Sequence, residues 1–178
     1  MRADTLRNRA ALIDAARRVF EVEGIDAPLE NVAAAAGLSR TSLHRAFSSR
    51  GELLAAIWAS DVAETEADAA RFADHPDAFV RLFDATLQQQ VDRRSIHPNA
   101  AQIESPDIVA LAARFVDAVQ SSAQVSRRAG VLRADVSDDL AVRSLGMAIW
   151  AVWNVADRAE RTRVAREVGE VLLRGLLA

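Results

Sequence analysis

The sequence predicts an all-α protein in which a three-helix helix-turn-helix domain precedes a helical bundle. Ala, Leu, Arg and Glu, which favour helices, dominate the 178 residues, whereas there are only seven glycines and four prolines. Apolar residues recur at the three- and four-residue spacing of a helix face along most of the chain. The sequence carries no competing strand pattern, no internal repeat and no flexible linker.

The first expected helix covers about residues 5–23. Its apolar stripe comprises Leu6, Ala10, Ile13, Ala16 and Phe20. Gly24 follows directly, which suits a left-handed cap at the end of a helix.

Two shorter helices are expected next, joined through Gly37-Leu38-Ser39. Pro28 suits the first position of the second helix, because its missing N–H would have no partner there. Ser39 is a natural N-cap for the third helix, which spans about residues 40–47. That helix carries Leu43 and Phe47 on one side, and its other side carries Arg40, Thr41, His44 and Arg45. Such a helix can bury its apolar side and lie in a DNA major groove.

Five longer helices are expected in the remainder of the chain. They cover about residues 49–70, 77–93, 107–128, 137–157 and 160–177. Residues 95–106 contain two prolines and are expected to form loops around a short helix, and residues 130–136 form a connection. The helix at 137–157 carries apolar residues on more than one face, so it is expected to pack on two sides. Gly146, Gly169 and Gly175 would permit close helix approach.

The charge is distributed unevenly. The net charge is −3, but residues 1–54 hold eight Arg against seven acidic residues, a net charge of +1, and the remainder carries −4. Residues 38–51 contain Arg40, Arg45 and Arg50 and no acidic residue. The planar guanidinium suits both phosphates and guanine edges, which favours nucleic acid as a partner for this segment.

Several functional classes are excluded by the residues that the chain lacks. There is no cysteine, and the three histidines lie far apart, so no metal site is expected. No Ser/His/Asp set and no phosphate-binding glycine loop appears, so we expect neither an enzyme nor a cofactor. The start lacks the apolar segment of a signal peptide, and the longest apolar run, residues 145–153, is too short to span a membrane. A soluble cytoplasmic protein is expected.

Residues 9–54 contain three runs in which apolar, small, glycine, cap and basic positions fall in register. They are Arg9-x-x-Leu12-Ile13-x-Ala15-Ala16-x-x-Val19-Phe20-x-x-x-Gly24, then Val32-Ala33-x-x-Ala36-Gly37-Leu38-Ser39-Arg40-Thr41-Ser42-Leu43-His44-Arg45-Ala46-Phe47, then Ser49-Arg50-x-x-Leu53-Leu54. These runs resemble the DNA-binding domain of TetR-family regulators. The sequence departs from the family at Pro28, His44 and Ala46, where some phosphate contacts of the family are weakened or replaced. His44 can still donate to a phosphate, more strongly when protonated, so DNA affinity is expected to depend on pH.

The resemblance implies a DNA-binding domain at residues 1–50 and an effector-binding and dimerisation domain at residues 51–178. It implies base contacts by Arg40, Thr41 and Ser42 and phosphate contacts by His44, Arg45 and Arg50, with Ser39 as the helix cap. The expected partners are a pseudo-palindromic operator in double-stranded DNA, a second copy of the chain and a small-molecule effector.

The resemblance also implies sites in the second domain. Pocket candidates are Trp58, Phe79, Phe83, Gln88, Phe115, Trp150, Trp153 and Asn154, with Gln102 as a further polar group; the aromatic ones are expected on inward faces. This supply of side chains favours a small, largely apolar effector. Candidates for the dimer interface are Leu145, Ile149, Val152, Val164, Val168, Val171, Leu172 and Gly175. The residues alone also allow all of these side chains to be intrachain core.

Two functions remain open from the sequence. The first is a transcriptional regulator, a repressor that an effector releases from its operator. The alternative is an interaction protein that keeps the fold but has weakened or lost DNA binding, to which the departures at Pro28, His44 and Ala46 point.

Overall fold

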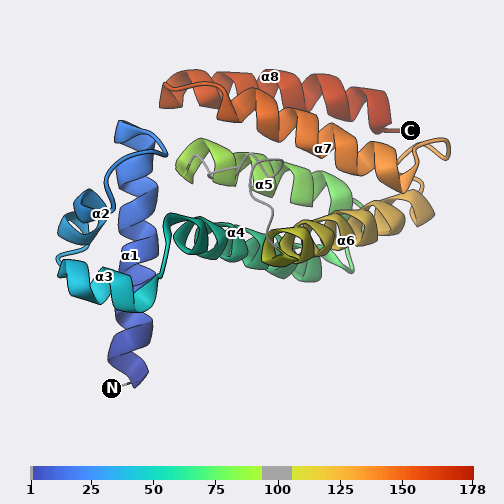
Figure 1. Ribbon diagram of the computed structural model, residues 1–178. Coiled ribbons are helices and arrows are strands. Elements are labelled where there is room, and N and C mark those ends of the chain that lie inside the picture. Colours follow the sequence, from blue (N-terminus) through green and yellow to red (C-terminus); the bar gives the residue numbers. More distant parts are fainter. Residues whose placement is uncertain (1, 94–105) are drawn as a thin grey trace. The chain divides into compact units, whose positions relative to one another are not determined.

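The computed structural model describes residues 2–93 and 106–178, which form eight helices and no strand. The helices are α1 (Arg2–Glu23), α2 (Leu29–Ala35), α3 (Arg40–Ala46), α4 (Arg50–Phe72), α5 (Ala78–Arg93), α6 (Pro106–Arg128), α7 (Asp138–Trp153) and α8 (Arg158–Leu176) (Figure 1). The prediction of an all-α fold is therefore confirmed. The predicted loops at 95–106, apart from Pro106, and the pocket candidate Gln102 lie outside the described residues.

The chain divides into two compact units: within the described residues, the first comprises residues 2–60 with residues 106–108 at the start of α6, and the second comprises residues 61–93 and 109–178. Because α4 runs from Arg50 to Phe72, it contributes residues to both units. The division of function at residue 50, between DNA binding and effector binding, stays a prediction.

The first unit packs α2, α3 and the start of α4 against α1. Its core contains buried side chains from all four helices, including Leu12, Phe20, Val32, Leu43, Phe47, Leu53 and Ile57. The predicted stripe on α1 is correct at Ala16 and Phe20 but wrong at Leu6 and Ala10, which are exposed. The reason is that the buried face of α1 is formed by Leu12, Ala15, Ala16 and Val19 with Phe20, and Leu6 and Ala10 lie off that face.

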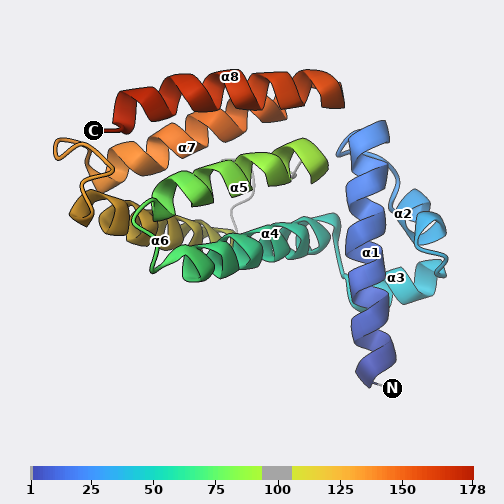
Figure 2. The same ribbon diagram turned by 180° about the vertical axis from the view of Figure 1, so that it is seen from behind.

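The second unit has its core among α5, α6, α7 and α8. Fully buried side chains include Phe79, Leu82, Phe83, Val119, Leu145, Ala148 and Val152. Helices α7 and α8 run side by side, and α5 lies beside them (Figure 2). None of the described helices is long and apolar enough to cross a membrane.

Glycine permits close packing at one of the three expected positions. A Cβ on Gly169 would lie 3.4 Å from Leu87 Cδ1 and 3.6 Å from Phe83 Cε1, so α8 approaches α5 closely there. Within the described chain a Cβ on Gly146 or Gly175 would meet nothing within 4 Å. At these two positions the expected close approach is therefore absent inside the monomer.

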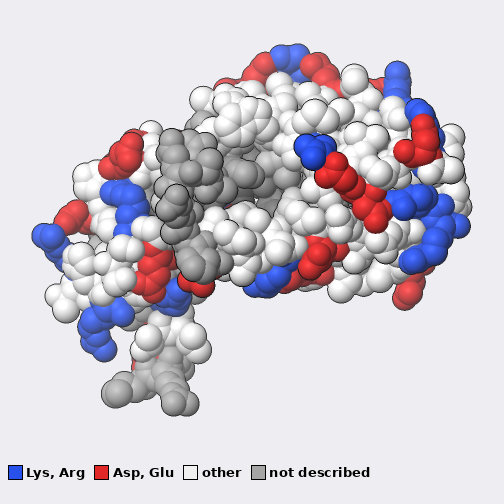
Figure 3. Space-filling model, turned by 45° about the vertical axis from the view of Figure 1, so that its right-hand side comes forward, with Lys and Arg blue, Asp and Glu red and all other residues white. Residues whose placement is uncertain are grey.

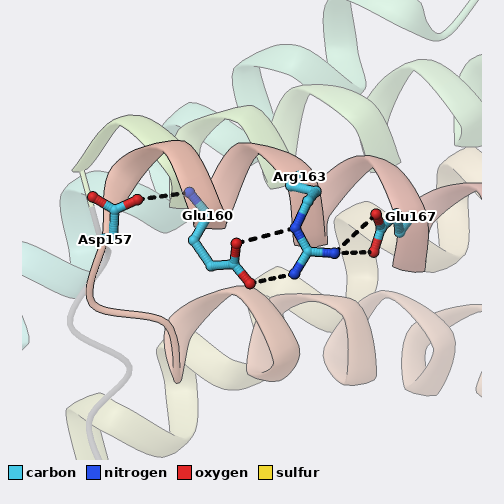
Figure 4. A network of polar contacts seen from close by, with 4 residues as sticks. All are labelled: Asp157, Glu160, Arg163 and Glu167. Carbon is cyan, nitrogen blue, oxygen red and sulfur yellow. Dashed lines mark hydrogen bonds and ion pairs between the residues drawn. The ribbon is translucent and has the colours of Figure 1, made fainter.

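The break between α7 and α8 falls earlier than the predicted residue 157. Asn154 donates its side-chain amide to Trp150 O at 2.7 Å and caps α7, which ends at Trp153. Asp157 then accepts a hydrogen bond from Glu160 N at 2.9 Å and begins α8. Beyond this cap, Arg163 bridges Glu160 and Glu167 along the exposed side of α8 (Figure 4). Two caps only three residues apart therefore replace the last turn of the predicted helix.

Acidic and basic side chains lie interleaved over the face of the second unit that Figure 3 shows. Ion pairs of the second unit include Arg114 with Glu66 and Arg127 with Asp138. This surface therefore lacks a large field of one sign, unlike the segment 38–51.

Candidate nucleic-acid interface

The turn between α2 and α3 requires Gly37. Its φ of 67° lies in the left-handed region, where a side chain costs energy, and Leu38 N donates to Ala33 O at 2.9 Å. Ser39 then caps α3, since its hydroxyl accepts a hydrogen bond from Ser42 N at 3.1 Å. The local sequence thus fixes both the end of α2 and the start of α3.

Two buried anchors set the rotation of α3. Leu43 and Phe47 are each 1% exposed in the core of the first unit. The rest of the helix surface presents Arg40, Thr41, His44 and Arg45, all of which are exposed. The structure thus brings the predicted contact residues of α3 onto one open surface, and their role toward DNA stays a prediction.

Arg40 is held by two side chains. Its Nη2 lies 3.1 Å from Glu30 Oε1 on α2, and its Nε donates a hydrogen bond to His44 Nε2 at 3.3 Å. Because protonated imidazole has no acceptor, the second contact requires neutral His44. Sequence reasoning named Arg40 and His44 but missed Glu30, which belongs to another helix.

Arg45 makes no ion pair with any residue that the structure describes. It lines a cavity of about 240 Å³ with Ser42 and Ala46 of α3 and with Asp4, Thr5 and Asn8 of α1. Asp4 also pairs with Arg7. Sequence reasoning missed this contribution of α1. The only signal was that Thr5 and Asn8 are polar residues three apart on one helix face.

Arg50, a predicted phosphate contact, braces the connection between α1 and α2. Its guanidinium donates to Ile25 O at 2.5 Å and to Ala27 O at 2.7 Å, and it lies 5.6 Å from the centre of the Phe20 ring. Because these donors serve the chain's own carbonyls, fewer remain for a phosphate. The predicted contact of Arg50 with DNA stays a prediction.

Arg9 likewise stabilises the end of α3 through a backbone carbonyl. It donates to Ala46 O at 2.7 Å and lies over the Phe47 ring at 4.2 Å. Glu52, 3.7 Å from Arg9, accepts hydrogen bonds from the backbone N and the hydroxyl of Ser48, and these bonds hold the pKa of Glu52 below its ordinary value. The start of α4 is therefore tied to the end of α3.

The predicted pocket residues differ in burial, and their role toward an effector stays a prediction. Phe79 and Phe83 are fully buried and pack edge to face at 5.8 Å, and Phe115 packs against the same core. Gln88 and Asn154 are exposed, and Trp58 belongs to the first unit.

The expectation that Trp150 faces inward is wrong. Trp150 is 51% exposed and stacks on the partly buried Trp153 at 5.4 Å, because α7 has its apolar core stripe on its other side.

The predicted dimer residues divide into two groups. Leu145, Ile149 and Val152 are buried in the core of their own chain, and Val164, Val168 and Leu172 pack partly buried against it. Val171 and Gly175 are exposed. A different apolar surface is open on α7 and α8, formed by Leu140, Met147, Trp150 and Val171, which are 41–71% exposed. We call these four residues the outer α7–α8 face.

Residues 12–57 match the family model described as "Bacterial regulatory proteins, tetR family". No curated protein sequence matches the chain. Solved structures of TetR-family regulators share its fold. One is PfmR from Thermus thermophilus, with 21% identity, a TM-score of 0.71 and coverage of 94% of this chain and 96% of PfmR. Another is a regulator from Mycobacterium vanbaalenii, with 21% identity, a TM-score of 0.69 and 99% coverage of both chains.

A third solved structure is the fatty acid degradation regulator FadR from Bacillus halodurans. It shares 15% identity with this chain, and the match covers 94% of this chain and 98% of FadR with a TM-score of 0.73. The fold therefore extends over both units, although the family model covers only part of the first.

Proposed function

From the match of residues 12–57 to the TetR-family model, we propose that this chain is a DNA-binding transcriptional regulator. It acts as a repressor that a small, largely apolar effector releases from a pseudo-palindromic operator. The observation that carries this proposal is the rotation of α3, which buries Leu43 and Phe47 and leaves Arg40, Thr41 and Arg45 open to solvent. Residues 1–50 form the DNA-binding domain, and residues 51–178 form the effector-binding and dimerisation domain.

In the proposed complex α3 lies in the major groove, where Arg40 and Thr41 contact base edges. Arg45 and His44 contact the phosphate backbone. Support for the phosphate contact comes from the cavity beside Arg45, where the hydroxyl of Ser42 and the amide of Asn8 are additional donors.

Dimerisation is proposed through the outer α7–α8 face. Its four apolar residues lie on adjacent helices and are exposed in the monomer, and Gly146 and Gly175 leave open space for a partner. This proposal replaces the buried residues Leu145, Ile149 and Val152 as contacts, because their side chains already pack inside one chain.

The effector is proposed to bind within the second unit. Its interior holds buried polar side chains among the apolar ones, including Thr86 and Gln90 of α5 and Ser122 of α6. Within the described part of the chain, Gln90 Oε1 is buried and accepts no hydrogen bond. A mainly apolar ligand that donates one hydrogen bond fits this arrangement.

The alternative function, an interaction protein without operator binding, is supported by arginines that already have partners within the chain. Arg9 and Arg50 donate to backbone carbonyls, and Arg40 is paired with Glu30. The carbonyls occupy donors of Arg9 and Arg50, and Glu30 offsets the positive charge of Arg40.

An electrophoretic shift assay at low salt, with the DNA that flanks the chain's own gene, separates the two functions. We expect the regulator to bind, and Arg45→Ala to weaken binding about tenfold or more. Arg166→Ala is the matched control, because Arg166 is an exposed arginine on α8. Absence of binding at low salt, or equal binding by Arg45→Ala and the unaltered protein, favours the alternative.

A further inference from the structure

We propose that Glu30 and His44 are positioning residues, which present one edge of the Arg40 guanidinium to a guanine in each half of the operator. This inference rests on the proposed function and deepens it, because it names a base and the residues that select it. It starts from the two contacts of Arg40 with α2 and with its own helix.

Among the described residues, the hydrogen bond of Arg40 uses one edge of the guanidinium plane. The group carries five N–H bonds in a fixed fork. Nε donates to His44 Nε2 at 3.3 Å, and the adjacent Nη2 lies 3.1 Å from Glu30 Oε1. The hydrogen bond to His44 uses the side edge, and no hydrogen bond among the described residues uses the other edge, between Nη1 and Nη2, which carries two parallel N–H bonds. Arg40 is thus oriented with a complete pair of donors to offer.

Guanine is the base that this pair fits in the major groove. Its O6 and N7 are neighbouring acceptors, so they accept two parallel hydrogen bonds from one guanidinium. Adenine presents an acceptor and a donor at the corresponding positions, and the donor faces an arginine unfavourably. An oriented Arg40 therefore discriminates between the two purines.

Glu30 and His44 also disfavour contacts between Arg40 and phosphates, which carry no sequence information. The Arg40 side chain is 69% exposed, and without partners it could turn to a phosphate on any DNA. The carboxylate of Glu30 holds the guanidinium and repels phosphates. His44 accepts from Nε only while neutral, which keeps the side edge occupied.

The test compares base preference with general DNA affinity. Double-stranded DNA with a randomised binding site is selected with the full chain, and competition binding then measures the preference at each position of a half-site. We expect the unaltered protein to prefer guanine at one position by about tenfold or more. Glu30→Ala lowers this preference several-fold and raises affinity for unrelated DNA, because it removes a negative charge.

Matched variants separate positioning from charge and from stability. Glu23→Ala removes the same charge from an exposed carboxylate that contacts Asn31 and no residue of α3, so it leaves the base preference unchanged. His44→Lys cannot accept a hydrogen bond, so it lowers the guanine preference. His44→Gln restores an acceptor and recovers part of the preference. Thermal unfolding of every variant excludes a loss of fold.

The outcomes are distinguishable. If the unaltered protein selects no sequence and binds no DNA, the proposed function fails and this inference fails with it. If it selects a sequence but Glu30→Ala keeps the guanine preference while remaining folded, only this inference is overturned. A sharper guanine preference in Glu30→Ala overturns it too, because Glu30 then competes with the base.

Discussion

Val171 and Val109 provide a matched test of the proposed dimer, because they are 71% and 70% exposed but only Val171 lies on the outer α7–α8 face. Val171→Ala removes two methyl groups from that face. At about 0.8 kcal/mol for each buried group, and with roughly 70% of the side chain newly covered, the loss is about 1.1 kcal/mol per subunit. A two-fold interface repeats the contact, so the dimer loses about 2.2 kcal/mol and its dissociation constant rises roughly 40-fold.

Sedimentation equilibrium over a range of protein concentrations measures this constant. Val109→Ala on α6 loses the same two methyl groups at an equally exposed position and is expected to leave the constant unchanged. Equal dissociation constants for the two variants would refute the assignment of this face to the dimer. So would a monomeric unaltered protein at every concentration.

Three further predictions concern stability, measured by urea unfolding. Nothing lies within 4 Å of a Cβ added at Gly37, so Gly37→Ala is expected to cost about 1–2 kcal/mol of unfolding free energy from backbone strain alone. Gly37→Asn is expected to cost less, because Asn adopts the left-handed conformation more readily than Ala. Equal stability of both variants would contradict this. Gly169→Leu is expected to destabilise by about 1–3 kcal/mol, since the added atoms meet Leu87, and unchanged stability would exclude close packing there. The side-chain hydrogen bond from Arg127 lowers the pKa of Asp138 below its ordinary value of 3.8. This contact therefore stabilises the fold at a pH above the ordinary value, and the stabilisation is lost as the pH falls through the lowered pKa. Asp138→Asn is therefore expected to be less stable than the unaltered protein at neutral pH, with a difference that shrinks in acid; a difference independent of pH would contradict the sign.

The fold of the first unit could be predicted from signals that are local in the sequence. Gly37 at a left-handed position and Ser39 as an N-cap are signals within one turn of their effect, and the apolar pair Leu43 and Phe47 fixes the rotation of α3. The partners of Arg50 could not be predicted in this way. They are carbonyls 23 and 25 residues earlier in the chain, and only the folded backbone brings them together.

The two faces of α7 show a different limit. The helix has apolar residues on both sides, and helical periodicity finds both but does not rank them. The stripe with Leu145, Ile149 and Val152 packs inside the chain, whereas Met147 and Trp150 remain outside. Sequence reasoning therefore predicted a helix that packs on two sides but assigned the inner side to the partner.

The contacts that Arg40 and Arg50 make within the chain affect how DNA affinity depends on ionic strength. Each phosphate that a protein cation neutralises releases counterions, and log K falls with log salt by about 0.9 per phosphate. Counting Arg40, Arg45 and Arg50 as phosphate contacts in both subunits gives a slope of about −5. With the donors of Arg50 used by its own backbone and Arg40 neutralised by Glu30, Arg45 remains of these three arginines, and its two copies give a slope of about −2. Changes in cellular salt would then alter occupancy little, and discrimination among sites would come from the bases themselves.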